Sequence, residues 1–271
     1  ADETVGATNC AIRVKNNKSI LTMFQNIEYH YNNLIRNSFS QIFKNGIWFF
    51  GAIACYRKTS LDKLGYFKKD TITEDMDIAM EMKKNGYRTI NVHNAAGYTS
   101  APDNLKDLYK QRARWWVGGL QTLLKNKTMF SSKYGASSIF LFVNQTFWSI
   151  YALISLPLIA YQVNYWLPYN SDTFLHLFNY LFRWFSLYGP VWVLYKIPSN
   201  GISYLSIFGV LSGILSTFMM LLSIKTFRDR LSLKNAIAIF FYFPYTIVLN
   251  IIIILSLFSF KLWKRGGYFV K

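Results

Sequence analysis

The sequence predicts an α/β region followed by an α-helical transmembrane bundle, and two observations support this fold class. First, residues 1–137 hold 20 of the 30 Lys and Arg residues and 11 of the 13 Asp and Glu residues. Second, residues 138–271 are rich in Phe, Leu, Ile, Tyr and Trp. Their apolar runs are long enough to cross a bilayer core of about 30 Å, which takes roughly 20 residues. A charged, folded region therefore precedes a membrane region.

The net charge of +17 narrows the range of partners. In a soluble protein this charge would suggest nucleic acid, but the chain has no RNA-binding signature and no long basic tract. A lipid bilayer with anionic headgroups and an anionic substrate are the expected partners, and nucleic acid is not. Cys10 and Cys55 are too few for a disulfide framework, which fits a reducing compartment. The three His residues show no metal-ligand spacing, so no metal site is predicted.

The first elements are predicted from alternation and helical periodicity. Residues 3–15 alternate mildly and favour a strand, and residues 19–43 place apolar side chains at helical spacing. Residues 45–65 open with an Asn-Gly turn signal and continue as an apolar, strand-like stretch that contains Gly51 and Ala52. Small residues in such a stretch allow a ligand or another backbone segment to approach closely.

The acidic stretch TITEDMDIAM predicts the start of a short helix. Thr73 suits the N-cap, and Glu74 and Asp75 suit the first turn, where negative charge meets the positive end of the helix dipole. The helix is expected over residues 74–85, and a strand is expected over residues 87–92. Taken alone, the three residues are explained by favourable charges at a helix N-terminus.

Asp77 is expected to be a solvated helix residue. Its spacing from Asp75 is that of an Asp-x-Asp metal motif, but a helical register turns the two carboxylates well apart. We therefore predict no metal site at this pair.

A second motif, QRARWW, lies on a helix predicted to begin near Pro102. Gln111, Arg114 and Trp115 are spaced i, i+3 and i+4, so they project from one face of that helix. Residues 115–137 add apolar residues flanked by Lys and predict an interfacial helix region on the membrane surface. Taken alone, the motif is equally typical of a basic, aromatic juxtamembrane helix.

The second half predicts about four membrane spans, at residues 138–160, 174–195, 202–224 and 235–260. The second span is the weakest, because it contains His176, Arg183 and Pro190. Four spans place both ends of the chain inside, and they place the basic loop with Arg228 and Arg230 outside. If the second span lay in the interface, that loop would be inside and the C-terminal tail outside.

Together, the two motifs contain the groups needed to transfer a sugar from a nucleoside diphosphate. Asp75 offers a carboxylate that accepts the proton of the attacking hydroxyl. Arg112 or Arg114 offers positive charge for the departing diphosphate. Trp115 offers a flat apolar surface for the sugar ring.

In these residues the sequence resembles the processive, membrane-embedded family 2 glycosyltransferases, which include cellulose, hyaluronan, chitin and poly-N-acetylglucosamine synthases. Thr73-Glu74-Asp75 matches the TED motif of that family, and residues 111–115 match its Q-x-x-R-W motif. Residues 50–67 resemble its small-residue acceptor loop and the strand that follows. The resemblance implies that residues 1–114 are part of a GT-A-type nucleotide-sugar transferase domain, followed by the interfacial region and the bundle at 138–271.

The resemblance also implies roles for individual residues. Asp75 would be the general base. The donor diphosphate and the terminal sugar of the acceptor would be bound by Gln111, Arg112, Arg114 and Trp115, with Glu74 beside them. Phe50, Gly51 and Ala52 would flank the acceptor.

One part of the family pattern has no counterpart here. The nucleotide-binding half of the catalytic domain, with an aspartate for uracil and an Asp-x-Asp that holds Mg²⁺ or Mn²⁺, is not recognisable in the sequence. We therefore expect the chain to be the C-terminal part of such an enzyme, unable on its own to bind donor or turn over. The ligands of Mg²⁺ or Mn²⁺ are expected in the missing N-terminal part.

The expected function is that of an inverting, processive glycosyltransferase, which transfers sugar from a UDP-sugar donor to a growing polysaccharide acceptor and exports the polymer. The expected location is the plasma membrane, with the catalytic region in the cytosol. Two alternatives stay open. One is a non-processive glycosyltransferase that acts on a lipid-linked acceptor, and the other is a membrane transporter or scaffold without catalysis.

Overall fold

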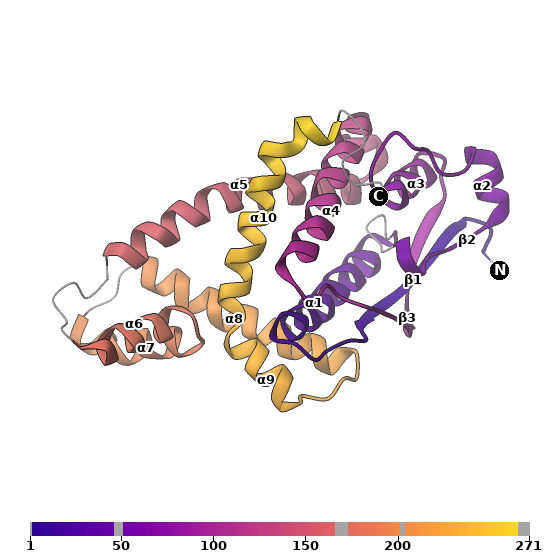
Figure 1. Cartoon of the computed structure of the whole chain (residues 1–271). Coiled ribbons are helices and arrows are strands. Elements are labelled where there is room, and N and C mark those ends of the chain that lie inside the picture. The colour runs from indigo at the N-terminus through magenta and orange to yellow at the C-terminus, as the bar shows by residue number, and fades with distance from the viewer. Residues whose placement is uncertain (1, 46–50, 166–172, 201–203, 265–271) are drawn as a thin grey trace.

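The computed structural model describes residues 2–45, 51–165, 173–200 and 204–264 (Figure 1). Its α/β part is built on a mixed sheet of three strands in the order β2-β1-β3 within these residues. The central strand pairs parallel with β3 and antiparallel with the short β2. The strands are β1 (Val5–Val14), β2 (Cys55–Tyr56) and β3 (Arg88–Thr99).

Helix α1 (Ile20–Phe43) lies between the sheet and the helices of the second half. The apolar spacing at 19–43 predicts this helix. In the structure its N-cap is Ser19, whose side chain forms a capping box with Thr22. Leu34 packs with Ala11 of β1, and Ile27 packs with residues of α8 and α9. The helix therefore joins the two halves of the chain.

The segment 45–65 differs from the apolar strand predicted for it. Residues 46–50, and with them Phe50, lie outside the described residues. Beyond them come a 3₁₀ turn, η1 (Gly51–Ile53), the two residues of β2, and helix α2 (Lys58–Leu64). Pairing with β1 is confined to Ala7 and Thr8, so apolar side chains alone did not extend the strand.

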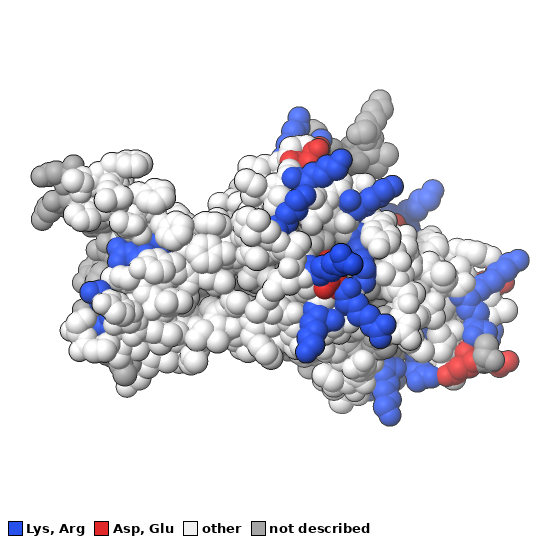
Figure 2. Space-filling model, turned by 90° about the horizontal axis from the view of Figure 1, so that it is seen from below, with Lys and Arg blue, Asp and Glu red and all other residues white. Residues whose placement is uncertain are grey.

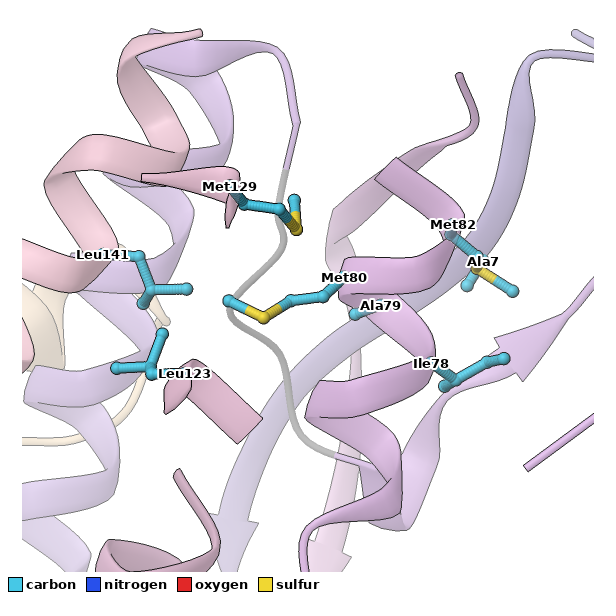
Figure 3. Packing of buried hydrophobic residues seen from close by; sticks show 8 residues of the cluster. All are labelled: Ala7, Ile78, Ala79, Met80, Met82, Leu123, Met129 and Leu141. Atoms are coloured by element: carbon cyan, nitrogen blue, oxygen red, sulfur yellow. The ribbon is translucent and has the colours of Figure 1, made fainter. Parts of the chain in front are cut away.

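Helix α3 (Glu74–Lys84) begins after Thr73 as predicted, and the chain then enters β3, which is longer than the predicted strand. The apolar side chains of α3 point in two directions (Figure 3). Ile78 and Met82 point toward Ala7 of β1, and Met80 points toward the other side. There it meets residues that follow the α/β part, namely Leu123, Met129 and Leu141. The helix that carries the acidic motif is therefore held from both sides.

Helix α4 (Leu105–Lys125) begins at Asn104, whose side chain accepts a hydrogen bond from the amide of Asp107. It therefore starts after Pro102 and runs without interruption past residue 115. The boundary predicted between a domain at 1–114 and an interfacial region at 115–137 thus falls inside one helix. On the C-terminal half of that helix, Val117, Gly118 and Leu123 are buried.

The described residues of the second half form helices joined by short connections. Three of its helices contain stretches long and apolar enough to cross a membrane, at Ala136–Asn164, Ile207–Thr226 and Tyr242–Phe260. Helices α5 and α8 extend away from the α/β part, whereas α10 packs along α4 (Figure 1). The helices are α5 (Ala136–Tyr165), α6 (Phe174–Trp184), α7 (Tyr188–Asn200), α8 (Tyr204–Thr226), α9 (Leu233–Phe240) and α10 (Tyr242–Lys264).

The predicted second span, 174–195, is divided into α6 and α7, and neither is among the three candidate stretches. The break is at residues 185–187, which places Pro190 in the first turn of α7. In a continuous helix, this proline would remove a hydrogen bond and clash with the preceding turn. The predicted fourth span, 235–260, is likewise divided into α9 and α10, with Pro244 in the first turn of α10.

The loop between α8 and α9 contacts the α/β part. Arg13 of β1 donates a hydrogen bond to the carbonyl of Phe227, and His30 Nε2 lies 2.8 Å from Asp229 Oδ2. A loop that contacts the α/β part lies on its side of any membrane. The four-span expectation places this loop across the membrane from the α/β part, whereas the alternative with an interfacial second span keeps the two on one side, as these contacts do.

Candidate active site

Asp75 lies in the first turn of α3, against the 3₁₀ turn η1. Its Oδ2 accepts a hydrogen bond of 2.9 Å from the amide of Gly51, and its Oδ1 accepts one of 2.9 Å from the amide of Met76. A Cβ atom at Gly51 would lie 2.5 Å from the Cβ of Asp75, so this contact requires glycine. The close approach expected of the small residues is thus made to the carboxylate itself. Ala52, the next residue, is exposed.

The residues that precede Asp75 are fixed to α4. The amide of Ile72 donates to Gln121 Oε1 at 3.1 Å, and the hydroxyls of Thr73 and Thr122 lie 3.1 Å apart. A Cβ at Gly118 would lie 2.5 Å from Thr73 Cγ2, so the two backbones meet at a glycine. The acidic motif and the helix that carries the Gln-Arg-Ala-Arg-Trp motif therefore form one unit.

Asp77 is buried, contrary to the expectation of a solvated residue. Its Oδ2 lies 2.6 Å from Lys125 Nζ, and its Oδ1 accepts from Asn126 Nδ2 at 3.2 Å. Two residues along the helix from Asp75, it faces the C-terminal end of α4 and holds the two helices together. The two carboxylates of the Asp-x-Asp pair thus have different partners.

Arg112 is buried and its guanidinium is engaged on several sides. Nη2 donates to Glu28 Oε2 at 2.7 Å, and Nη1 donates to Gln111 Oε1 at 2.8 Å. The guanidinium carbon lies 4.3 Å from the centre of the Trp115 ring. Burial lowers the pKa of Arg112, but the carboxylate of Glu28 outweighs it, so the net shift is upward and the guanidinium stays charged.

Trp115 packs on a buried cluster that includes Tyr29 of α1 and Ile12 of β1. The Trp115 ring meets that of Tyr29 edge-on, with centroids 6.5 Å apart. Ile53, in the turn that holds Asp75, packs on the same cluster. The turn at 51–53 thus binds Asp75 through Gly51 and shares a buried cluster with Trp115 through Ile53.

Arg114 and Glu74 are exposed, on α4 and at the start of α3 respectively. Unlike Arg112, whose charge is paired inside the protein, Arg114 presents its charge to solvent. Of the two arginines singled out in the motif, Arg114 is thus the one open to a dissolved anion.

Two charged residues of α1 belong to this region and were not singled out from the sequence. Glu28 pairs with Arg112, and Arg36 lies close enough to Asp75 for the two charges to interact. Burial lowers the pKa of Arg36 to about 9, and the Asp75 carboxylate opposes that shift. Both residues lie on α1, which is far from the two motifs in the sequence and meets them only in the folded chain. Sequence spacing therefore could not indicate that they belong to the site.

Tyr56 of β2 also faces the acidic motif. Burial raises the pKa of its hydroxyl, and the carboxylates of Asp75 and Glu74 raise it further. The phenol therefore stays protonated at neutral pH beside the two acids.

Among the described residues, no three His, Cys, Asp or Glu side chains gather closely enough to hold Mg²⁺ or Mn²⁺. Within that part of the chain, Asp75 and Asp77 therefore do not belong to a metal site.

Comparison with known proteins gives curated relatives that match slightly less than half of this chain, and a family model that matches nearly all of it. Poly-beta-1,6-N-acetyl-D-glucosamine synthase of Staphylococcus aureus (strain COL) is 32% identical over 127 residues, which is 46% of this chain and 30% of the relative. The synthase of Staphylococcus epidermidis is 31% identical over 124 residues, or 45% of this chain and 30% of the relative. The aligned part thus spans about a third of the length of these curated relatives.

A mannosyltransferase of Pyrobaculum calidifontis, solved in complex with GDP-Man and Mn²⁺, aligns with 98% of this chain and 56% of its own chain, at a TM-score of 0.48 and 15% identity. The family model described as Glycosyl transferase family group 2 matches residues 1–263. This match covers nearly the whole sequence and confirms the predicted class, an α/β region of the glycosyltransferase type followed by helices. The chain therefore belongs to the glycosyl transferase family group 2.

Proposed function

We propose that the protein transfers sugar units from a UDP-sugar to the end of a growing polysaccharide, with inversion at the anomeric carbon, and exports the polymer. The observation that carries this proposal is the position of the Asp75 carboxylate at the turn η1, whose Ile53 shares a buried cluster with Trp115. Family membership supports glycosyl transfer, and the names of the synthases it resembles support a polysaccharide product. By the same relatives, UDP-N-acetylglucosamine is the first donor to test.

The geometry supports a defined role for Asp75. Its carboxylate takes the proton from the attacking hydroxyl of the acceptor sugar, whose oxygen forms the new bond to the anomeric carbon as the bond to the diphosphate breaks. The donor leaves as UDP, and the proton stays on Asp75 until solvent removes it. The amides of Gly51 and Met76 fix the direction of the carboxylate before the reaction.

Arg114 and Trp115 fit complementary parts of the substrate. The exposed guanidinium of Arg114 stabilises negative charge that develops on the leaving diphosphate. The indole of Trp115, held on one side by Arg112 and Tyr29, offers a ring face to the terminal sugar of the acceptor. Gln111 lies one turn before Trp115 on the same helix and supplies an amide for sugar hydroxyls.

The helices of the second half support a location in the plasma membrane, with the α/β part in the cytosol. Three stretches have the length and apolar character to cross the bilayer. On the face drawn in Figure 2, Lys and Arg side chains gather over the α/β part, and the projecting helices are mostly uncharged. Basic residues gather on the cytosolic side of membrane proteins, and anionic headgroups attract them there.

The proposal is tested by sugar incorporation in membranes that carry the full-length protein. The membranes are supplied with a panel of labelled UDP-sugars and with Mg²⁺ or Mn²⁺, the cofactors that the family resemblance implies. Long polymer made from one donor is the expected result. Short, lipid-linked product would show a non-processive enzyme instead. No transfer from any donor by folded protein would contradict the proposal and favour a transporter or scaffold.

A further inference from the structure

We infer that Arg112 is a positioning residue, which together with Glu28 and Tyr245 sets the orientation of Gln111 and Trp115 and couples them to helix α10. The inference rests on the proposed function and adds a role that the motif does not indicate. It starts from the finding that an arginine of the substrate-facing motif is turned into the protein.

The contacts of Arg112 leave it little capacity to bind a diphosphate. Both terminal nitrogens donate hydrogen bonds, one to Glu28 and one to Gln111, and the indole of Trp115 covers a face of the guanidinium. The remaining nitrogen, Nε, is buried and has no hydrogen-bond partner among the described residues. The side chain is 8% exposed. A phosphate oxygen could reach it after the pair with Glu28 had been broken, which would leave a buried carboxylate without a partner.

The same contacts make Arg112 suited to hold its neighbours in place. The hydrogen bond to Gln111 Oε1 fixes the side-chain amide and leaves its NH₂ group to donate elsewhere. The stacking on Trp115 fixes one face of the indole. Arg112 therefore determines how two residues of the substrate-facing side of α4 are presented.

Tyr245 connects this arrangement to the second half of the chain. Its hydroxyl donates to Glu28 Oε2, the oxygen that also accepts from Arg112. Its ring stacks on Phe24 of α1 at a centroid distance of 5.5 Å and meets Tyr242 edge-on at 5.6 Å. Tyr245 thus fastens the first turns of α10, which holds one of the three candidate membrane spans, to α1 and α4.

The connection gives the site a mechanical link to the helices. A displacement of α10 moves the Tyr245 hydroxyl, and the shared carboxylate of Glu28 passes that displacement to Arg112 and thus to Trp115. Since Trp115 is proposed to hold the acceptor end, the link acts on acceptor placement. Donor binding, which involves the exposed Arg114, is expected to depend on it far less.

The first test compares kinetics of the full-length enzyme in membranes. Glu28→Gln, Arg112→Gln and Tyr245→Phe are each expected to lower kcat several-fold and to shorten the polymer, while KM for the UDP-sugar stays within about twofold of wild type. The double variant Glu28→Gln/Arg112→Gln is expected to lose no more than either single variant, because both remove one unit. Arg114→Gln is the contrasting variant and is expected to raise the donor KM. Lys127→Gln, at an exposed position, serves as the unchanged control.

The second test does not depend on turnover and keeps the inference falsifiable if a donor cannot be found. The protein is labelled with 5-fluorotryptophan, and the ¹⁹F signal of Trp115 is assigned as the one that disappears in Trp115→Phe. The expected result is a shift of that signal in all three variants and no shift in Lys127→Gln.

Two results would overturn the inference. One is a donor KM raised by Arg112→Gln as much as by Arg114→Gln, with Glu28→Gln and Tyr245→Phe unchanged, because Arg112 would then bind the donor directly. The other is a Trp115 signal that stays in place in Glu28→Gln and Tyr245→Phe. Lack of transfer by wild type with the expected ¹⁹F shifts would contradict the proposed function and leave the positioning unit standing.

Discussion

At the scale of single residues, the surroundings of Asp75 explain why one carboxylate of the acidic motif is suited to chemistry. It lies at the positive end of α3 and accepts hydrogen bonds from two backbone amides, one of which belongs to Gly51, 24 positions earlier in the chain. Asp77, on the same helix, is buried against Lys125 and Asn126 and is structural. The identical side chains differ because a helical register turns them to different neighbours.

Gly51→Ala tests the contact on which the position of Asp75 depends. The added Cβ would lie 2.5 Å from the Cβ of Asp75, so the carboxylate or the turn has to move. We expect transfer to fall by about 100-fold, as for other displacements of roughly 1 Å at reacting groups. The measurement is kcat with the unfolding temperature recorded alongside. Gly209→Ala is the matched control, because a Cβ there meets nothing within 4 Å. Full activity of Gly51→Ala would show that the contact does not position the base.

At the scale of secondary structure, the site depends on how closely α4 approaches the loop before α3. That approach is set by Gly118, where a Cβ would lie 2.5 Å from the methyl group and 3.0 Å from the amide nitrogen of Thr73. At Gly119, one residue along the same helix, a Cβ would first meet Met76 Sδ at 4.0 Å. Substitution by alanine is therefore expected to lower stability at Gly118 and not at Gly119.

We expect Gly118→Ala to destabilise the protein by about 1–3 kcal/mol, because an overpacked contact forces the backbones apart. Gly119→Ala is expected to be neutral or to stabilise by about 0.5–1 kcal/mol, since alanine is the better helix former. Thermal or denaturant unfolding in detergent measures both. Equal effects of the two substitutions would contradict the packing described at Gly118.

Elements defined by local signals were predicted well from the sequence. The helix at 19–43 follows from its apolar spacing, and the face shared by Gln111 and Trp115 follows from helical spacing. Helix α3 starts after Thr73 as predicted, but the Thr73 hydroxyl pairs with Thr122 and makes no capping hydrogen bond. The segment 45–65 was predicted less well, because its apolar composition does not reveal that β1 pairs with two of its residues. The burial of Asp77 and Arg112 was also missed. Their partners, Lys125 and Glu28, lie 48 and 84 residues away and meet them only in the folded chain.

At the scale of the whole molecule, the two halves are joined by α1 and by the loop between α8 and α9. His30 is buried in this joint, and its Nε2 faces Asp229. Burial lowers the pKa of His30 below its usual value of 6.5, and Asp229 offsets this in part. The neutral imidazole is therefore the form that the folded protein favours.

This shift predicts how stability depends on pH. The imidazole of His30 binds a proton more readily in the unfolded chain than in the folded protein. The contribution of neutral His30 to stability is therefore complete above about pH 6.5 and is lost as the pH falls toward the lower pKa of the folded state. Each unit of pKa depression corresponds to about 1.4 kcal/mol. Unfolding temperatures between about pH 7.5 and 5.5 are expected to fall more steeply for wild type than for His30→Gln. Parallel curves would contradict a buried, neutral His30.

The position of the α8–α9 loop makes a prediction about membrane topology. Its contacts with Arg13 and His30 place it on the side of the α/β part, which requires an even number of crossings between residues 136 and 227. A chain with Cys10→Ser, Cys55→Ser and Arg230→Cys is expected to react with an impermeant maleimide in inverted vesicles and not in intact cells. Labelling in intact cells would restore the four-span arrangement.

The catalytic role of Asp75 is tested most directly by comparing Asp75→Asn with Asp77→Asn in the incorporation assay. Asparagine at position 75 keeps an acceptor for the Gly51 amide but no longer takes up a proton, so transfer is expected to fall by about 10²–10⁴-fold with unfolding unchanged. Asp77→Asn is expected to cost about 1–3 kcal/mol of stability and to keep its kcat where the protein is folded. The reverse pattern, or a fully active Asp75→Asn enzyme, would contradict the claim that Asp75 is the general base of a glycosyltransferase.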